Sequence, residues 1–281
     1  MRVLSCFRTI RGARFALGVG LLLGLIGCGL APTSSPVPSQ APPTLAPATD
    51  APVGQPTAVG QAPKEAILIL SPGPGSRLTS PIHLQGMADP SFEQTLAVRL
   101  LADDGSQIAS LSTTIQADAG QRGVFKVDVP FSVGQTRQAF LQVFATSPRD
   151  GGVTHLASVG VQLAPGGSAD IHPAEPHAEQ IAIRQPQPGE TVGGGRLHVA
   201  GFGLAGFEQT LVIDVYDAQG NQLAEQPVIV KAPDLGLPGP FEGELSYALA
   251  QPGPGRVVVR DVSPAFGGDT HLASVEVRLQ P

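Results

Sequence analysis

Hydrophobic residues occupy every second position in several short stretches of this chain. A period of two places alternate side chains on the same face of a β-strand. Residues typical of turns, mainly Gly, Pro and Asp, separate the stretches. About seven such stretches within ~100 residues are typical of an immunoglobulin-like antiparallel sandwich. The stretches first occur at residues 67–70, 82–86, 96–100, 107–115, 125–129, 138–145 and 154–163.

The whole pattern occurs twice. Phe-Glu-Gln-Thr-Leu at residues 92–96 recurs at 207–211, and Thr-His-Leu-Ala-Ser-Val at 154–159 recurs at 270–275. The two offsets, 115 and 116 residues, are too long for a solenoid repeat and match the size of a domain. We therefore predict an all-β protein with two tandem immunoglobulin-like antiparallel β-sandwiches.

The start of the chain has the pattern of a signal peptide. Arg residues precede a 13-residue apolar stretch, residues 15–27, which is too short to span a bilayer. The stretch ends in Leu25-Ile26-Gly27-Cys28, which resembles a bacterial lipobox. The resemblance implies cleavage before Cys28 and a lipid on its thiol, so we expect a lipid anchor at the extracytoplasmic side of the cell membrane. An ordinary signal peptide or an uncleaved anchor is the alternative.

The composition completes the domain plan. The 35 Gly and 28 Pro residues exceed average usage, and a Pro-, Ala-, Ser- and Thr-rich stretch follows Cys28. We expect that stretch to be a disordered tether, because it lacks the residues needed for a core. The predicted parts are a signal peptide (1–27), a tether (28–64), a first domain (65–163), a linker (164–178) and a second domain (179–281).

Charge and motifs exclude several functions. The signal segment holds four of the 17 basic residues and none of the 23 acidic ones, so its removal changes the net charge from −6 to −10. An acidic body disfavours binding to phosphate backbones, and we expect no nucleic-acid partner. Nucleophile-elbow, Cys–His and phosphate-loop motifs are absent from the sequence, so we expect no enzyme and no cofactor. Only Cys6 accompanies Cys28, which leaves the mature protein without a disulfide.

Further short motifs point to a family. In the first copy they are Ser71-Pro72, Pro74-Gly75, Ser80-Pro81-Ile82, Gly86-Met87-Ala88, Phe92-Glu93, Asp104-Gly105, Gly123-Val124-Phe125 and Ser147-Pro148-Arg149-Asp150-Gly151. With these motifs, the first copy resembles the immunoglobulin-like domain associated with spore-germination GerMN proteins, over about residues 66–163. The second copy resembles it more loosely over 180–280 and departs from the pattern at Gly193–Gly195, Gln219 and Ala265–Gly267. The resemblance implies an extracytoplasmic binding or scaffold module without catalytic residues.

The repeated words supply candidate ligand-binding residues. Glu93 and Glu208 each follow a Phe, and His83 and His198 lie on the outward phase of a strand. One carboxylate per domain does not form a general acid–base pair, so ligand contact or a local hydrogen bond is the expected role. We expect Phe92 and Phe207 to fill the core.

Other histidines are candidates for metal binding. His155 and His271 lie on the inward phase of the last predicted strand of each copy. A metal site needs several convergent ligands, and the sequence does not show that His83 and His155 converge. The predicted linker contains a further group of histidines and acidic residues, namely Asp170, His172, Glu175 and His177. We interpret this group as part of a solvated polar segment, and we expect no metal site.

These observations predict a non-enzymatic, membrane-anchored lipoprotein that acts as a binding or scaffold module at the bacterial cell envelope. The expected partners are the membrane, through the N-terminal lipid, and an envelope protein or a cell-wall glycan. A structural spacer without a specific ligand is an alternative. An envelope hydrolase of unrecognised type is a further one, and it requires a convergent catalytic pocket.

Overall fold

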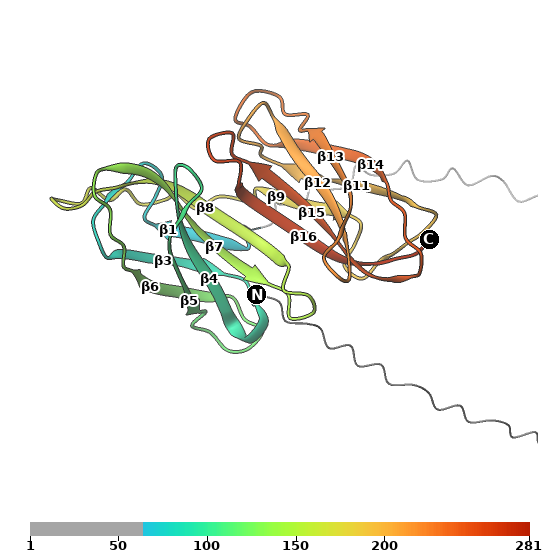
Figure 1. Ribbon diagram of the computed structural model, residues 1–281, viewed down its shortest axis with the longest axis horizontal. Coiled ribbons are helices and arrows are strands. Elements are labelled where there is room, and N and C mark those ends of the chain that lie inside the picture. Colours follow the sequence, from blue (N-terminus) through green and yellow to red (C-terminus); the bar gives the residue numbers. More distant parts are fainter. Residues whose placement is uncertain (1–63) are drawn as a thin grey trace, which may run out of the picture. The chain divides into compact units, whose positions relative to one another are not determined.

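The computed structural model describes residues 64–281 (Figure 1). These residues form strands and one short 3-10 turn, η1 (Phe92–Gln94), which confirms the all-β prediction. Among them, no helix has the length and apolarity needed to cross a membrane. The predicted signal peptide, Cys28 and nearly all of the predicted tether lie outside the described residues.

The first domain is a sandwich of two sheets. One sheet has the order β1-β3-β6, and the other has the order β5-β4-β7-β8, with the short β2 added parallel to the end of β8. Neighbouring strands within each sheet are otherwise antiparallel. The strands are β1 (Ile67–Ser71), β2 (Arg77–Leu78), β3 (Ile82–Ala88), β4 (Thr95–Ala102), β5 (Gln107–Thr114), β6 (Gly123–Val129), β7 (Arg137–Thr146) and β8 (Val153–Leu163).

The second domain repeats this topology strand for strand. Its sheets have the orders β9-β11-β14 and β13-β12-β15-β16, and the short β10 runs parallel to the end of β16. The structure thus contains two tandem sandwiches, as the sequence repeats predict. The strands are β9 (Ile181–Gln185), β10 (Thr191–Val192), β11 (Arg196–Gly203), β12 (Thr210–Asp217), β13 (Gln222–Ile229), β14 (Gly239–Ser246), β15 (Gly253–Val262) and β16 (Asp269–Leu279).

Each domain has its own hydrophobic core between its two sheets. A phenylalanine from β6 or β14 lies at the centre of each core, Phe125 in the first and Phe241 in the second, and both are fully buried. The ring lies against a glycine of the neighbouring strand, Gly86 or Gly201, where any side chain would collide with it. The Gly and Phe positions of the sequence pattern therefore form one packing unit in each domain.

The linker between the domains follows the first domain closely. Its main chain bonds to the loop after β1, with the amide of Gly73 donating to the carbonyl of His172 and that of Ala174 donating to Leu70. The amides of Arg77 and Asp170 each donate to the other's carbonyl at 2.8 Å. These bonds lead the chain back along β1 before it enters β9.

We predict that Gly86→Ala destabilises the protein by about 3 kcal/mol, the upper end of the usual cost of overpacking, because both main-chain and side-chain atoms must move. A Cβ atom at Gly86 would lie 2.3 Å from the Leu68 carbonyl oxygen and 2.4 Å from the Phe125 ring. The matched control is Gly134→Ala, where no atom lies within 4 Å of the added carbon and about 1 kcal/mol or less is expected. Urea unfolding measures both changes, and equal effects would contradict this account of the core.

Candidate functional site at the junction of the two domains

The two domains are joined by their repeated last strands. β8 and β16 pair antiparallel through His155–Leu156–Ala157 and His271–Leu272–Ala273, which merges the larger sheets into one. Leu156 lies opposite Leu272, its own equivalent in the repeat, and His155 lies opposite Ala273 as His271 lies opposite Ala157. The contact therefore has a local pseudo-twofold axis through the two leucines, as in an isologous interface.

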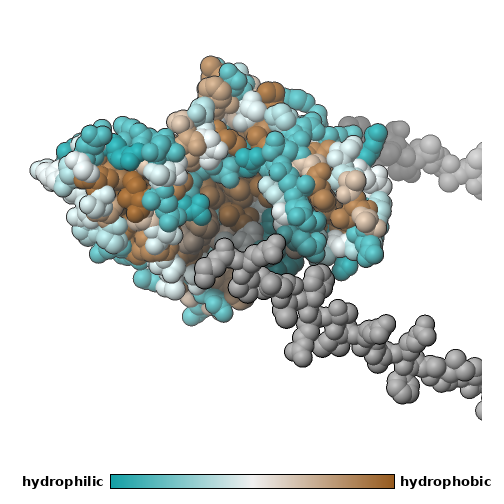
Figure 2. All heavy atoms as spheres, viewed as in Figure 1, coloured by the Kyte–Doolittle hydropathy of each residue, from teal (hydrophilic) through white to brown (hydrophobic). Residues whose placement is uncertain are grey.

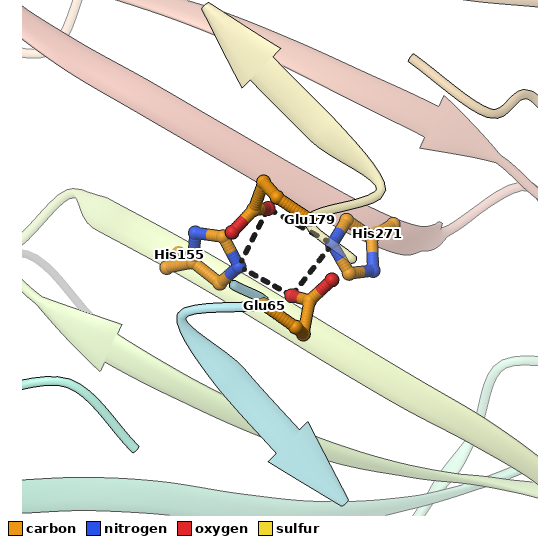
Figure 3. Close-up of side chains that lie close together, drawn as sticks. All are labelled: Glu65, His155, Glu179 and His271. Carbon is orange, nitrogen blue, oxygen red and sulfur yellow. Dashed lines mark hydrogen bonds and ion pairs between the residues drawn. The ribbon is translucent and has the colours of Figure 1, made fainter. Parts of the chain in front are cut away.

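Four ionisable side chains converge beside this contact (Figure 3). They are Glu65 and Glu179, which precede the first strands β1 and β9, and His155 and His271 from β8 and β16. Each domain thus contributes one glutamate and one histidine from equivalent positions. We call these four residues the junction cluster.

Nitrogen and oxygen atoms alternate around the junction cluster. His155 Nε2 lies 2.9 Å from Glu65 Oε1 and 3.3 Å from Glu179 Oε1. His271 Nε2 lies 3.2 Å and 3.7 Å from the same two oxygens. The two imidazole rings are perpendicular to each other, with centroids 5.5 Å apart. All four atoms therefore face one common point.

The second oxygen of each glutamate is held by the other domain. Glu179 Oε2 accepts a hydrogen bond of 2.9 Å from the amide of Ala66, and Glu65 Oε2 accepts one of 3.0 Å from the amide of Gln180. This exchange follows the same pseudo-twofold relation as the strands. It leaves the two Oε1 atoms directed at the histidines.

The junction cluster is shielded from water. The side chain of Glu65 is 0% exposed, and those of His271, Glu179 and His155 are 4%, 8% and 12% exposed. Burial opposes the charge on His271, but the glutamates Glu179 and Glu65 outweigh it and raise its pKa to about 9. Burial likewise opposes the charge on Glu65, and the two histidines outweigh it and hold the pKa of Glu65 far below its usual value.

A second group of charges connects the domains next to the strand contact. Arg256 on β15 is buried, and its Nη2 atom lies 2.6 Å from Asp150 of the first domain and 3.0 Å from Glu276 of its own domain. Burial would raise the pKa of Asp150, but Arg149, the amide of Gly152 and Arg256 lower it to about 2. These charges are mutually paired, so they have a structural role.

His83 and His198, the histidines predicted as ligand-binding candidates, lie elsewhere and do not converge. His83 is exposed on β3, and its Nδ1 lies 2.7 Å from Asp128 on β6. His198 is exposed on β11, and its Nδ1 lies 3.1 Å from the side-chain oxygen of Gln185 on β9. His155 meets His271 rather than His83. In the linker, His177 lies 3.6 Å from Glu65, on the outer side of the junction cluster.

Glu93 and Glu208 occupy exposed corners between the two sheets of each domain. Both adopt positive φ, 53° and 48°, as does the glutamine that follows each. The hydroxyl of Thr95 donates to the main-chain carbonyl of Glu93, and Thr210 does the same at Glu208, so the carboxylates do not receive these bonds. Both glutamates are exposed and remain candidates for contact with a ligand.

The expectation that Phe92 and Phe207 fill the core is wrong. Their exposed fractions are 55% and 50%. The left-handed residues after each Phe turn the chain sharply at the crossover, so Leu96 and Leu211 enter the core instead. The corners thus present an aromatic ring next to a carboxylate in each domain.

Sequence reasoning missed Glu65 and Glu179. The signal was present, because Glu-x-Ile occurs at the start of both copies, at residues 65–67 and 179–181. It was short compared with the repeated words. The longest repeated word, at residues 154–159 and 270–275, is the one that forms the strand contact.

Comparison with known families agrees with this architecture. A family model for the immunoglobulin-like domain of bacterial spore germination matches residues 66–152 and again residues 180–268. The chain belongs to this family. The resemblance seen in the sequence is confirmed, including the presence of two tandem copies. Membership in this family supports a binding or scaffold role.

Solved structures show only distant similarity, and no curated protein matches the chain. Dimeric latent PorU from Porphyromonas gingivalis is 13% identical with a TM-score of 0.29, and the match covers 81% of this chain and 21% of PorU. Red sea bream transglutaminase is 10% identical with a TM-score of 0.28, over 79% of this chain and 32% of the enzyme. The titin domains Z1Z2 in complex with telethonin are 14% identical with a TM-score of 0.19, covering 77% and 96%. At these scores the similarities carry no argument about function.

Proposed function

We propose that this protein is a non-enzymatic, lipid-anchored module that binds or scaffolds a partner at the extracytoplasmic side of the bacterial cell membrane. Cys28 carries the lipid, the segment up to residue 64 supplies reach, and the two sandwiches provide the binding surface. The partner is an envelope protein or a cell-wall glycan.

One observation carries the binding role: both domains present the same exposed corner, built from the repeated Phe-Glu-Gln word. Phe92 and Phe207 are about half exposed, beside the solvent-facing Glu93 and Glu208. Four non-glycine residues with positive φ hold these corners, and such strain recurs at functional positions in proteins. A partner with repeated units can engage both corners and gain avidity.

The rest of the surface supports a binding rather than a catalytic role. Figure 2 shows apolar and polar groups interspersed on one face of the described residues. In that part of the chain, the histidines and carboxylates that converge closely enough to share one ion are those of the buried junction cluster. A buried cluster with one ligand atom from each residue directed inward offers little room for a substrate.

We predict that Cys28→Ser abolishes lipid labelling and releases the protein from the membrane fraction, because the thiol is the attachment point implied by the lipobox. Incorporation of a labelled fatty acid and fractionation of the host envelope measure both effects. Cys6→Ser is the matched control, since this cysteine lies within the predicted signal peptide and its loss leaves labelling unchanged. Retention of Cys28→Ser in the membrane would contradict the anchor.

The binding role is tested with purified peptidoglycan and with solubilised envelope proteins of the host. We expect saturable binding by the full chain and a loss of about tenfold or more for the double variant Phe92→Ser/Phe207→Ser, because exposed aromatic residues commonly dominate interfaces. Leu235→Ser removes a side chain that is 78% exposed outside the repeated corners, and it should bind normally. Absence of any binding by folded protein would favour a spacer without a ligand.

A further inference from the structure

We propose that the junction cluster binds one divalent transition-metal ion, with zinc as the best fit, and that this ion ties the two immunoglobulin-like domains together. The expectation from sequence is that no metal site exists. The inference does not depend on the binding role or on the lipid anchor.

The spacing of the four ligand atoms fits a single ion. In a tetrahedral zinc site with bonds of about 2.0–2.1 Å, neighbouring ligand atoms lie about 3.3 Å apart. The four nitrogen–oxygen distances in the junction cluster are 2.9, 3.3, 3.2 and 3.7 Å. No two of the four atoms are more than 4.8 Å apart, so a common point lies within about 2.9 Å of each. Inward shifts of less than about 1 Å bring all four atoms to the bond lengths of a zinc site.

Two of these atoms face ion-pair partners but make no hydrogen bond. Glu179 Oε1 and His271 Nε2 are buried and lie 3.7 Å from each other, and neither makes a hydrogen bond within the described part of the chain. Leaving a buried polar atom unpaired costs about 1–3 kcal/mol, and more for a charged group. Both atoms point to the common centre, so one ion satisfies them together.

The surroundings orient the carboxylates for this role. The amides of Ala66 and Gln180 hold the two Oε2 atoms, which fixes each carboxylate with Oε1 directed inward. Metal ligands are commonly oriented by such outer hydrogen bonds. His177 contacts the outer oxygen of Glu65, 3.6 Å away, and so does not compete for the centre.

The donor set selects the ion. Two imidazoles and two carboxylates suit zinc and other first-row transition metals, whereas calcium and magnesium prefer all-oxygen sites. A divalent ion also balances the two carboxylate charges, which are costly to bury alone. Four protein ligands leave no open position, so the site is structural. Each domain supplies two ligands, and the ion therefore links the domains.

Cobalt(II) titration of the purified full chain tests the proposal. Tetrahedral cobalt gives visible absorption bands, and we expect these bands at one cobalt per chain, lost when zinc is added. A sulfur-to-cobalt charge-transfer band should be absent, which distinguishes this site from Cys6 and Cys28. Zinc at about one hundred times its dissociation constant should raise the melting temperature by about 5–10 °C.

Substitutions test whether the cobalt absorption bands come from the junction cluster. Glu179→Gln and His271→Gln should each weaken cobalt binding by more than about 100-fold, since even outer-shell changes cost 10–100-fold. His83→Gln and His198→Gln are matched controls on exposed histidines and should bind normally. Circular dichroism confirms folding, and the glutamate variant keeps the test valid if the buried histidine variant unfolds. Wild-type protein without cobalt bands, or controls that lose them equally, would overturn the proposal and leave an ion-pair cluster only.

Discussion

The antiparallel contact between β8 and β16 covers two sheet edges that would otherwise present unpaired main-chain groups. Such edges are prone to pair with other chains, and proteins commonly cover them. The C-terminal end of each strand is covered within its own domain, β8 by β2 and β16 by β10. The N-terminal parts of β8 and β16 pair with each other. The remaining features of the junction depend on this register, because it brings the Nε2 atoms of His155 and His271 to the same two glutamates.

The charges at the junction are stable only as a set. Moving a glutamate or a histidinium out of water costs several kcal/mol, and interactions with its partners must offset that cost. Glu65 and Glu179 each accept a hydrogen bond from an amide of the opposite domain, and each lies within ion-pair distance of both histidines. Losing one member leaves a buried charge that the others no longer balance. The junction therefore favours one arrangement of the two domains.

Much of the fold could be predicted from the sequence because its determinants are local. A period of two, frequent turn residues and two long repeated words were enough for two tandem sandwiches, and the structure adds only short strands such as β2 and β10. The junction cluster could not be predicted, since it depends on which strand edges meet. Glu65 and His155 are 90 residues apart, and no spacing rule joins them. The position of Phe92 was missed because its direction is set by the positive φ of Glu93 and Gln94, which β-strand patterns do not anticipate.

Amide hydrogen exchange of the full chain tests most directly whether the two domains share one sheet. Within residues 155–157 and 271–273, some amides point to β7 or β15 of their own domain and the others point across the junction. For the amides that point across the junction, we predict exchange as slow as in the interior strands β7 and β15. The outer strands β5 and β13, at the two ends of the combined sheet, provide the internal reference for an open edge. Exchange of the cross-junction amides as fast as at the open edges of β5 and β13 would contradict the shared sheet, because the domains would then be joined by the linker alone.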